Sequence, residues 1–276
     1  MLTKGEEEEG RLLVVSLNTN MFASNVQDAL AQHAPASHQL NWLERTLQND
    51  TSQQGVVIIG HHPPGISLFS LYNNEAAKAN WKLVYFERFR SICSAAAGNN
   101  RIVGMFFGHE HQDSFAVEEE DAAAAGITGG SSEKLAIFSI PSVSPVYQGQ
   151  PSYSVAQLNP QNQQLQDLTT YHTWLDFYTR TGDTPQFFSY QSVGGILRVE
   201  ELSFETLSNA AQTIIEQSGG GMKTCLALKN RIYQGRYVPT LPPHLHYCYS
   251  TTLRVSSFIA CIEKYGYDGK KYIVNG

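Results

Sequence analysis

Histidines gather in two short stretches of the chain, and each stretch follows an apolar run that ends in glycine. The first reads VVIIGHHPPG, residues 56–65, and the second reads GMFFGHEHQDSF, residues 104–115. Neutral imidazole is a good ligand for zinc and other transition metals. Open α/β sheets place their chemistry at the carboxyl ends of their strands. We therefore interpret the two stretches as halves of one metal site.

Three histidines are the predicted metal ligands, namely His61, His109 and His111. On an extended backbone an H-x-H pattern sends alternate side chains to one face, so His109 and His111 are expected to address one metal or two neighbouring metals. The PPG run at residues 63–65 stiffens the loop that follows His61 and is expected to hold its imidazole at a fixed angle. A lone histidine in such a turn more often makes local hydrogen bonds, but two strand-end motifs together favour a metal.

The neighbouring polar residues receive weaker assignments. On an extended strand His62 is expected to point away from His61, and a local role is preferred to ligation. Glu110 is likewise expected to face away from the metal, either at the surface or supporting a ligand from behind. Asp113 either orients a ligand histidine or is a solvated loop acid, and the sequence leaves both open. Cys93 falls on the apolar face of a predicted helix, where a buried thiol is expected rather than a nucleophile.

The elements that must position these residues follow from hydrophobic periodicity. Strands are predicted at 12–17, 56–59, 102–107, 135–140 and 152–158, and helices from 37 to about 52, at 76–97 and at 203–217. The 76–97 helix is expected to bury Trp81, Val84, Tyr85, Phe89 and Ile92 on one face. The βαβαβ order, followed by further strands, predicts an α/β layered domain.

Composition excludes several classes of protein. The 276 residues carry a net charge of -6 without a basic stripe, which argues against binding to a nucleic-acid polymer. No run approaches the roughly 20 apolar residues of a transmembrane segment. The N-terminus, MLTKGEEEEG, is acidic, so no signal peptide is expected in this chain. The four cysteines form no C-x-x-C pair, which disfavours a structural zinc knot.

The motifs together resemble a known family. GHHPPG followed by FFGHEHQDSF, with SLNTN at 16–20 and QLNWLERTL at 39–47, is similar to the calcineurin-like metallophosphoesterases. More narrowly, the chain resembles the acid sphingomyelinases and the acid sphingomyelinase-like phosphodiesterases. The resemblance implies an α/β fold in which residues 1–183 are the C-terminal half of an α/β/β/α sandwich. A smaller helical C-terminal region, residues 184–276, is implied to follow.

The resemblance also implies a function and a site. The family hydrolyses phosphodiesters with two zinc ions, and His61 and His109 match ligands of one metal while His111 matches a ligand of the other. The implied substrate is a phosphodiester of the lipid head group or nucleotide type. A Cys248–Cys261 pair and a secreted or lysosomal location are implied as well.

The chain departs from the family pattern in its other motifs. The D-x-H, bridging G-D and G-N-H-E motifs of the family's N-terminal half have no counterpart, because Gly182-Asp183 lies too far downstream and Gly98-Asn99-Asn100 lacks the histidine. We therefore expect an incomplete chain that binds one zinc or none and has weak or no activity alone. The alternative is a non-catalytic metal-binding or scaffold remnant of the fold.

Loss of half of a two-sheet sandwich is expected to expose an apolar sheet face. Three explanations stay open for that surface. A partner covers it, the protein is unstable alone, or the sequence is a partial gene product.

Overall fold

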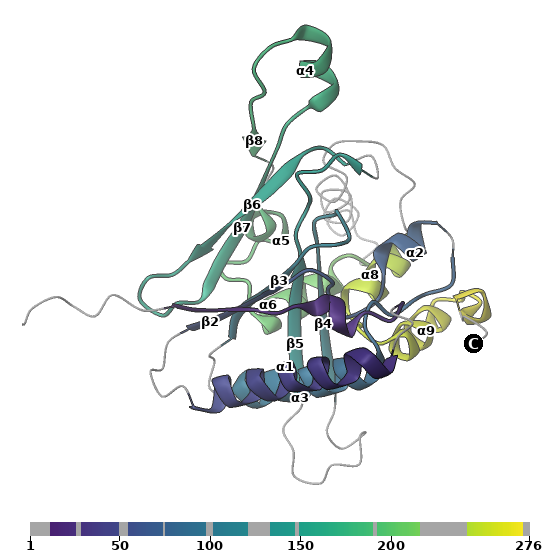
Figure 1. Ribbon diagram of the computed structural model, residues 1–276. Coiled ribbons are helices and arrows are strands. Elements are labelled where there is room, and N and C mark those ends of the chain that lie inside the picture. The colour runs from purple at the N-terminus through teal and green to yellow at the C-terminus, as the bar shows by residue number, and fades with distance from the viewer. Residues whose placement is uncertain are drawn as a thin grey trace, which may run out of the picture.

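The protein is described by a computed structural model (Figure 1), which covers residues 12–25, 29–49, 55–73, 75–97, 102–120, 133–146, 149–189, 192–215 and 242–272. The glutamate run at 6–9, the glycine-rich segment at 122–132 and Cys225 lie outside the described residues.

A five-stranded sheet lies at the centre of the fold (Figure 1). In spatial order its strands are β1 (Leu12–Ser16), β2 (Gly55–Gly60), β3 (Ile102–Phe107), β5 (Glu133–Ser139) and β4 (Ser114–Glu120). The first four run parallel, and β4 pairs antiparallel with β5. Apolar runs such as GVVIIG and IVGMFF suit strands that are covered on both faces. The strands predicted at 56–59 and 102–107 are confirmed.

Helices α1 (Ala29–Asn49) and α3 (Leu83–Ala97) lie along one face of this sheet (Figure 1). Leu40, Leu43 and Leu47 of α1 are buried against the sheet, as their helical spacing predicts. The predicted helix at 76–97 is partly wrong, because α3 begins only at Leu83. Trp81 is buried in the segment before the helix, where it forms an isolated bridge with Ala23.

The other face of the sheet carries a second, antiparallel sheet and two short helices. Its strands are β6 (Ser152–Leu158), β7 (Leu165–His172) and β8 (Phe188–Ser189), and the helices are α5 (Val193–Leu197) and α6 (Phe204–Gln212). Phe115 and Phe138 of the central sheet pack in one cluster with Leu165, Leu168 and Leu207. The fold is therefore mixed α/β with a parallel-rich central sheet, as the sequence predicts.

Among the described strands, exposed large apolar side chains lie on β1 and on the second sheet. Others lie outside the strands, such as Val143 and also Val84 of α3, whose predicted burial is wrong. Val14 of β1 is 55% exposed, and Val155 of β6 is 48% exposed. On the face of the second sheet that carries Val155, the rings of Tyr153 and Tyr171 stack with centroids 5.3 Å apart. The central sheet is covered on both faces at β3, β5 and β4, so apolar exposure is confined to these two places among the described strands.

The remaining elements form a third layer of packing at one end of the sheet. They are α2 (Leu68–Tyr72), α8 (Pro243–Ser250) and α9 (Val255–Lys264), and the 3-10 turn η3 (Gly269–Tyr272) follows α9. The 3-10 turn η1 (Thr19–Phe22) follows β1, and helix α4 (Leu175–Thr181) projects from the body of the fold (Figure 1). Buried side chains of α2, α8 and α9 share one cluster. A disulfide between Cys248 and Cys261 joins α8 to α9, which confirms the predicted pair.

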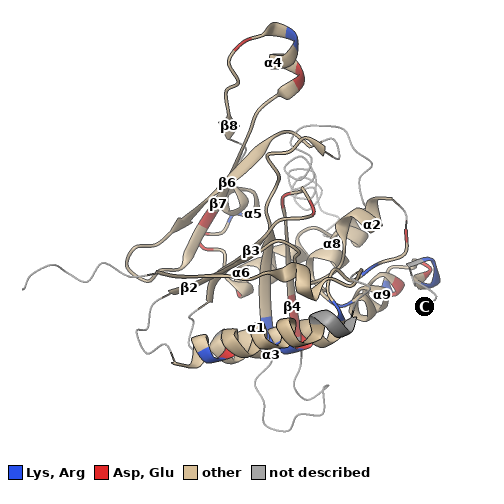
Figure 2. Cartoon of the chain, viewed as in Figure 1, with Lys and Arg blue, Asp and Glu red and all other residues tan. Residues whose placement is uncertain are grey.

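Charged residues of both signs are spread over the described elements. Figure 2 shows basic residues scattered among acidic ones on the described elements, without a continuous basic stripe. None of the described helices is both long enough and apolar enough to cross a bilayer.

Candidate metal centre

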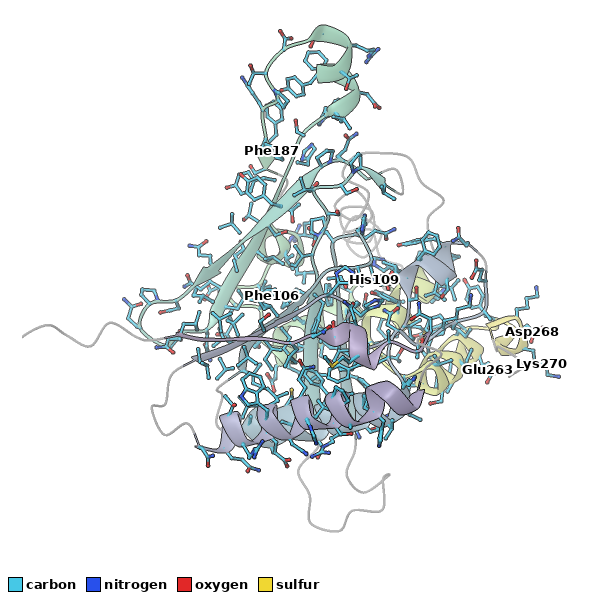
Figure 3. All side chains as sticks on the ribbon, in the orientation of Figure 1. Phe106, His109, Phe187, Glu263, Asp268 and Lys270 are labelled. Carbon is cyan, nitrogen blue, oxygen red and sulfur yellow. A yellow bond between two sulfur atoms is a disulfide. The ribbon has the colours of Figure 1, made fainter. Side chains whose placement is uncertain are left out.

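The two histidine stretches meet at the carboxyl ends of β2 and β3. These strands are adjacent and parallel, and Gly60 at the end of β2 lies opposite Phe107 at the end of β3. The following loops are joined directly, because the Gly108 N–H donates to the His61 carbonyl at 2.9 Å. His109, labelled in Figure 3, is half-buried and follows the last residue of β3 by two positions. The strand order therefore brings the two stretches together, as predicted.

The backbone of the first loop is fixed by groups from distant parts of the chain. The His61 N–H donates to Thr19 Oγ1 at 2.9 Å, and Trp81 Nε1 donates to the His62 carbonyl at 3.0 Å. Thr19 and Trp81 are both almost completely buried. A Cβ on Gly60 would lie 2.6 Å from Thr19 Cγ2, so only glycine allows this approach. Thr19, part of the SLNTN segment, thus positions the first histidine.

The second loop has a backbone that its sequence does not suggest. β3 ends at Phe107, and His109 and His111 both adopt left-handed conformations, with φ of 68° and 52°. Histidine is among the residues that adopt this region more readily than most. The expected extended H-x-H segment is therefore wrong, and side-chain alternation does not apply to this pair. The turn is closed by the Glu110 N–H, which donates to the Gly108 carbonyl at 2.8 Å.

Three imidazoles converge at this edge of the sheet. The ligand nitrogens of His61, His62 and His109 all lie within 4.8 Å of one another. The ring centroid of His61 is 5.1 Å from that of His62 and 5.2 Å from that of His109, with near-perpendicular planes. The expectation that His62 points away is wrong, because β2 ends at Gly60 and His62 follows in a bend rather than an extended strand. His111 is not one of the three.

The environment favours the neutral form of two of these rings, His62 and His109. Burial lowers the pKa of His62 to about 4, with smaller contributions from His109 and His61. Burial also lowers the pKa of His109, and His61 and His111 act in the same direction. The effect of His111 places it near His109 although it lies outside the three-ring group. Metal ligation requires deprotonated histidine, so this donor set suits a borderline transition metal such as zinc.

The acidic residues beside the histidines are buried and turned elsewhere. Glu110 is 4% exposed and accepts hydrogen bonds from Asn80 Nδ2 at 2.8 Å and from the Phe69 N–H at 3.1 Å. It faces away from the three rings as predicted, but a surface position is wrong. Burial raises the pKa of Glu110, and those hydrogen bonds act against the rise.

Asp113 is also buried, at 3% exposure, and accepts a hydrogen bond from Thr170 Oγ1 of β7. A solvated loop acid is therefore the wrong alternative for Asp113. The three-ring group itself contains no carboxylate.

Three further side chains that could do chemistry lie elsewhere in the fold. Cys93 is fully enclosed in α3, and burial raises the pKa of its thiol, which argues against a nucleophile. His172 of β7 accepts a hydrogen bond from Trp174 Nε1 at 2.7 Å. His246 is buried in α8. None of the three residues belongs to the three-ring group.

The central sheet is parallel-rich, with helices on one face and a second sheet on the other, and histidines lie at its strand ends. These features define a metallophosphoesterase-like α/β fold. The chain is related in sequence to the acid sphingomyelinase-like phosphodiesterases. It is 35% identical over 121 residues to human acid sphingomyelinase-like phosphodiesterase 3b and 29% identical over 177 residues to cyclic GMP-AMP phosphodiesterase SMPDL3A of Bos taurus. It is also 27% identical over 161 residues to sphingomyelinase phosphodiesterase D of Dictyostelium discoideum.

These matches are partial on both sides. They cover 43%, 59% and 58% of this chain and 24%, 34% and 34% of the respective relatives. The chain thus spans about a third or less of the length of these relatives. A comparison with protein-family models finds no match.

Proposed function

We propose that this chain is a metal-binding segment of a phosphodiester hydrolase of the sphingomyelin phosphodiesterase-like type. The observation that carries the proposal is the convergence of His61 and His109, from two adjacent strand ends, with nitrogens close enough to address one ion. Relatives named as phosphodiesterases support the reaction class. The substrate is a phosphodiester of the lipid head group or nucleotide type.

In the proposed site His61 and His109 bind one zinc ion, and this chain alone is expected to hold one ion or none. In the family pattern that the chain resembles, His111 matches a ligand of a second zinc ion. When bound, zinc polarises the phosphoryl group and lowers the pKa of a water molecule. The chain's own residues hold this arrangement in place. Thr19 positions the His61 backbone, and the Gly108 N–H joins the two loops through the His61 carbonyl.

The proposal is tested by hydrolysis of bis(p-nitrophenyl) phosphate and p-nitrophenyl phosphorylcholine by the purified chain with added zinc. We expect weak turnover, since the group of three rings lacks the carboxylate that a dinuclear site uses as a bridge. His61→Ala and His109→Ala should each abolish hydrolysis of both esters. His38→Ala, which alters an exposed histidine on α1, is the matched control and should leave the rate unchanged. Turnover that survives both site substitutions contradicts the proposal.

The second candidate is a non-catalytic metal-binding or scaffold protein that keeps the fold. It is favoured by the absence of a carboxylate from the three-ring group. The two candidates differ in one measurement. Stoichiometric zinc binding with no hydrolysis of either ester, at any zinc concentration, selects the scaffold.

We also propose a secreted or lysosomal location. The Cys248–Cys261 disulfide supports it, because such bonds persist in oxidising compartments. The division into residues 1–183 and 184–276 stays a prediction. A partner that covers apolar surface likewise stays a prediction, and the outer face of β6 and β7 and strand β1 are the places where it would bind.

A further inference from the structure

We infer that His62 is a third metal ligand, and that His61, His62 and His109 form a mononuclear transition-metal site within this chain alone. The inference deepens the metal-binding part of the proposed function and is independent of hydrolysis. It assigns the ion to one centre made of three imidazoles, instead of to a pair of centres that need further ligands. The chemical class of the ligand is a divalent zinc-like cation.

The first step is the position of the rings. A histidine nitrogen lies about 2.0–2.1 Å from zinc, so its ring centre lies roughly 3.2 Å from the ion, and tetrahedral angles set ring centres roughly 5.2 Å apart. The His61–His62 and His61–His109 centroids are 5.1 and 5.2 Å apart, at interplanar angles of 89° and 78°. Two of the three ring pairs therefore already have the spacing of a tetrahedral site.

The third pair requires a movement. The rings of His62 and His109 are 3.6 Å apart at an angle of 35°. They must separate by roughly 1.6 Å to reach the tetrahedral spacing. Because Trp81 Nε1 holds the His62 carbonyl and Gly108 holds the His61 carbonyl, side-chain rotation supplies this movement while the backbone stays in place.

The third step is the chemistry of the donors. All three are imidazoles, which suit zinc, cobalt(II), nickel(II) and copper(II) better than magnesium or calcium. Catalytic zinc sites have three protein ligands and one open coordination position, whereas structural zinc sites have four protein ligands and no open position. Three imidazoles match the first arrangement. His61 is exposed while His62 and His109 are half-buried, so the open position faces solvent.

The test measures metal binding in the full chain. Zinc content after dialysis gives the stoichiometry, competition with a chromophoric chelator gives the affinity, and the visible spectrum of the cobalt(II) form reports the coordination. We expect one ion per chain and a tetrahedral cobalt(II) spectrum. His62→Ala should lower the zinc affinity at least about 10-fold. Replacing even a residue that only supports a metal ligand lowers metal affinity about 10- to 100-fold.

His38→Ala is the control and should change zinc affinity less than about twofold, because His38 is an exposed residue of α1. His111→Ala tests the mononuclear assignment, which expects it to cost less zinc affinity than His62→Ala because His111 lies outside the three-ring group. X-ray absorption of the zinc form counts the imidazoles directly, with three expected for the parent chain and two for His62→Ala. The number of imidazoles bound to zinc can be measured even if His62→Ala makes the folded protein less stable.

The outcomes separate the two proposals. If His62→Ala binds zinc as tightly as the parent while His61→Ala and His109→Ala do not, His62 only packs against His109 and the inference fails, but the proposed function stands. If loss of His111 costs as much as loss of His62, the mononuclear assignment is overturned. If the parent chain binds no zinc, both fail.

Discussion

Replacing Gly60 with alanine should destabilise the protein by crowding the residue that positions His61. The new Cβ would lie 2.6 Å from Thr19 Cγ2 and 3.0 Å from Phe107 Cε1. Thr19 is completely buried, so it cannot move without disturbing its neighbours. The displaced hydroxyl would also release the His61 N–H, which it now holds at 2.9 Å.

The size of the effect follows from these two contacts. Overpacking a well-packed interior costs about 1–3 kcal/mol, and losing one hydrogen bond costs about 1 kcal/mol. Gly60→Ala should therefore lower the free energy of unfolding by about 2–4 kcal/mol. At about 3 °C per kcal/mol for a chain of this size, the melting temperature should fall by roughly 6–12 °C.

Urea denaturation and a thermal melt followed by circular dichroism measure this change. Gly108→Ala is the matched control, because the same substitution at the end of β3 places a Cβ at an ordinary 3.5 Å from His61 Nδ1. It should cost less than about 1 kcal/mol. A Gly60→Ala protein as stable as the parent, or a Gly108→Ala protein equally destabilised, would refute the reasoning.

Three further changes test other parts of the structure. Replacing Cys248 and Cys261 with serine removes a disulfide between residues 13 positions apart and should lower the free energy of unfolding by about 3 kcal/mol. An unchanged urea midpoint would contradict this. Thr170→Val leaves the buried Asp113 carboxylate without its hydroxyl donor and should cost about 1–3 kcal/mol, more than the same change at Thr169. Burial raises the pKa of Glu118 above its ordinary 4.5. Ionisation of Glu118 is therefore less favourable in the folded state than in the unfolded state, and it lowers the free energy of unfolding as pH rises above 4.5. Glu118→Gln should therefore raise the melting temperature at pH 7, with the gain vanishing below pH 4.5; a gain independent of pH would exclude this cause.

Much of the scaffold was predictable because its signals are local. β2 and β3 are apolar runs bounded by turn residues, and α1 repeats leucine at helical spacing. Adjacent parallel strands then bring their carboxyl ends together, which is why the approach of His61 and His109 was foreseeable. The Cys248–Cys261 disulfide followed only from the family resemblance, since cysteine spacing alone does not fix a pairing.

The parts that escaped prediction depend on contacts between distant residues. Trp81 has a helical spacing to Tyr85, yet it is recruited by the His62 carbonyl and by Ala23, so the helix begins only after it. β4 and β7 are broken by polar residues, whose partners, such as Thr170 for Asp113, appear only in the folded chain. His62 joins the rings because its strand stops at Gly60, two residues before His62, whereas the prediction assumed an extended backbone through His62.

Strand β1 has a consequence for how the isolated chain behaves at high concentration. Among the described strands it pairs only with β2, which leaves its other side without a neighbour in that part of the chain. Leu12 and Val14 are 38% and 55% exposed along it. An apolar strand with unpaired backbone groups is a template for strand addition. Edge-to-edge association should start here, and a lysine in place of Val14 should delay aggregation without touching the histidines.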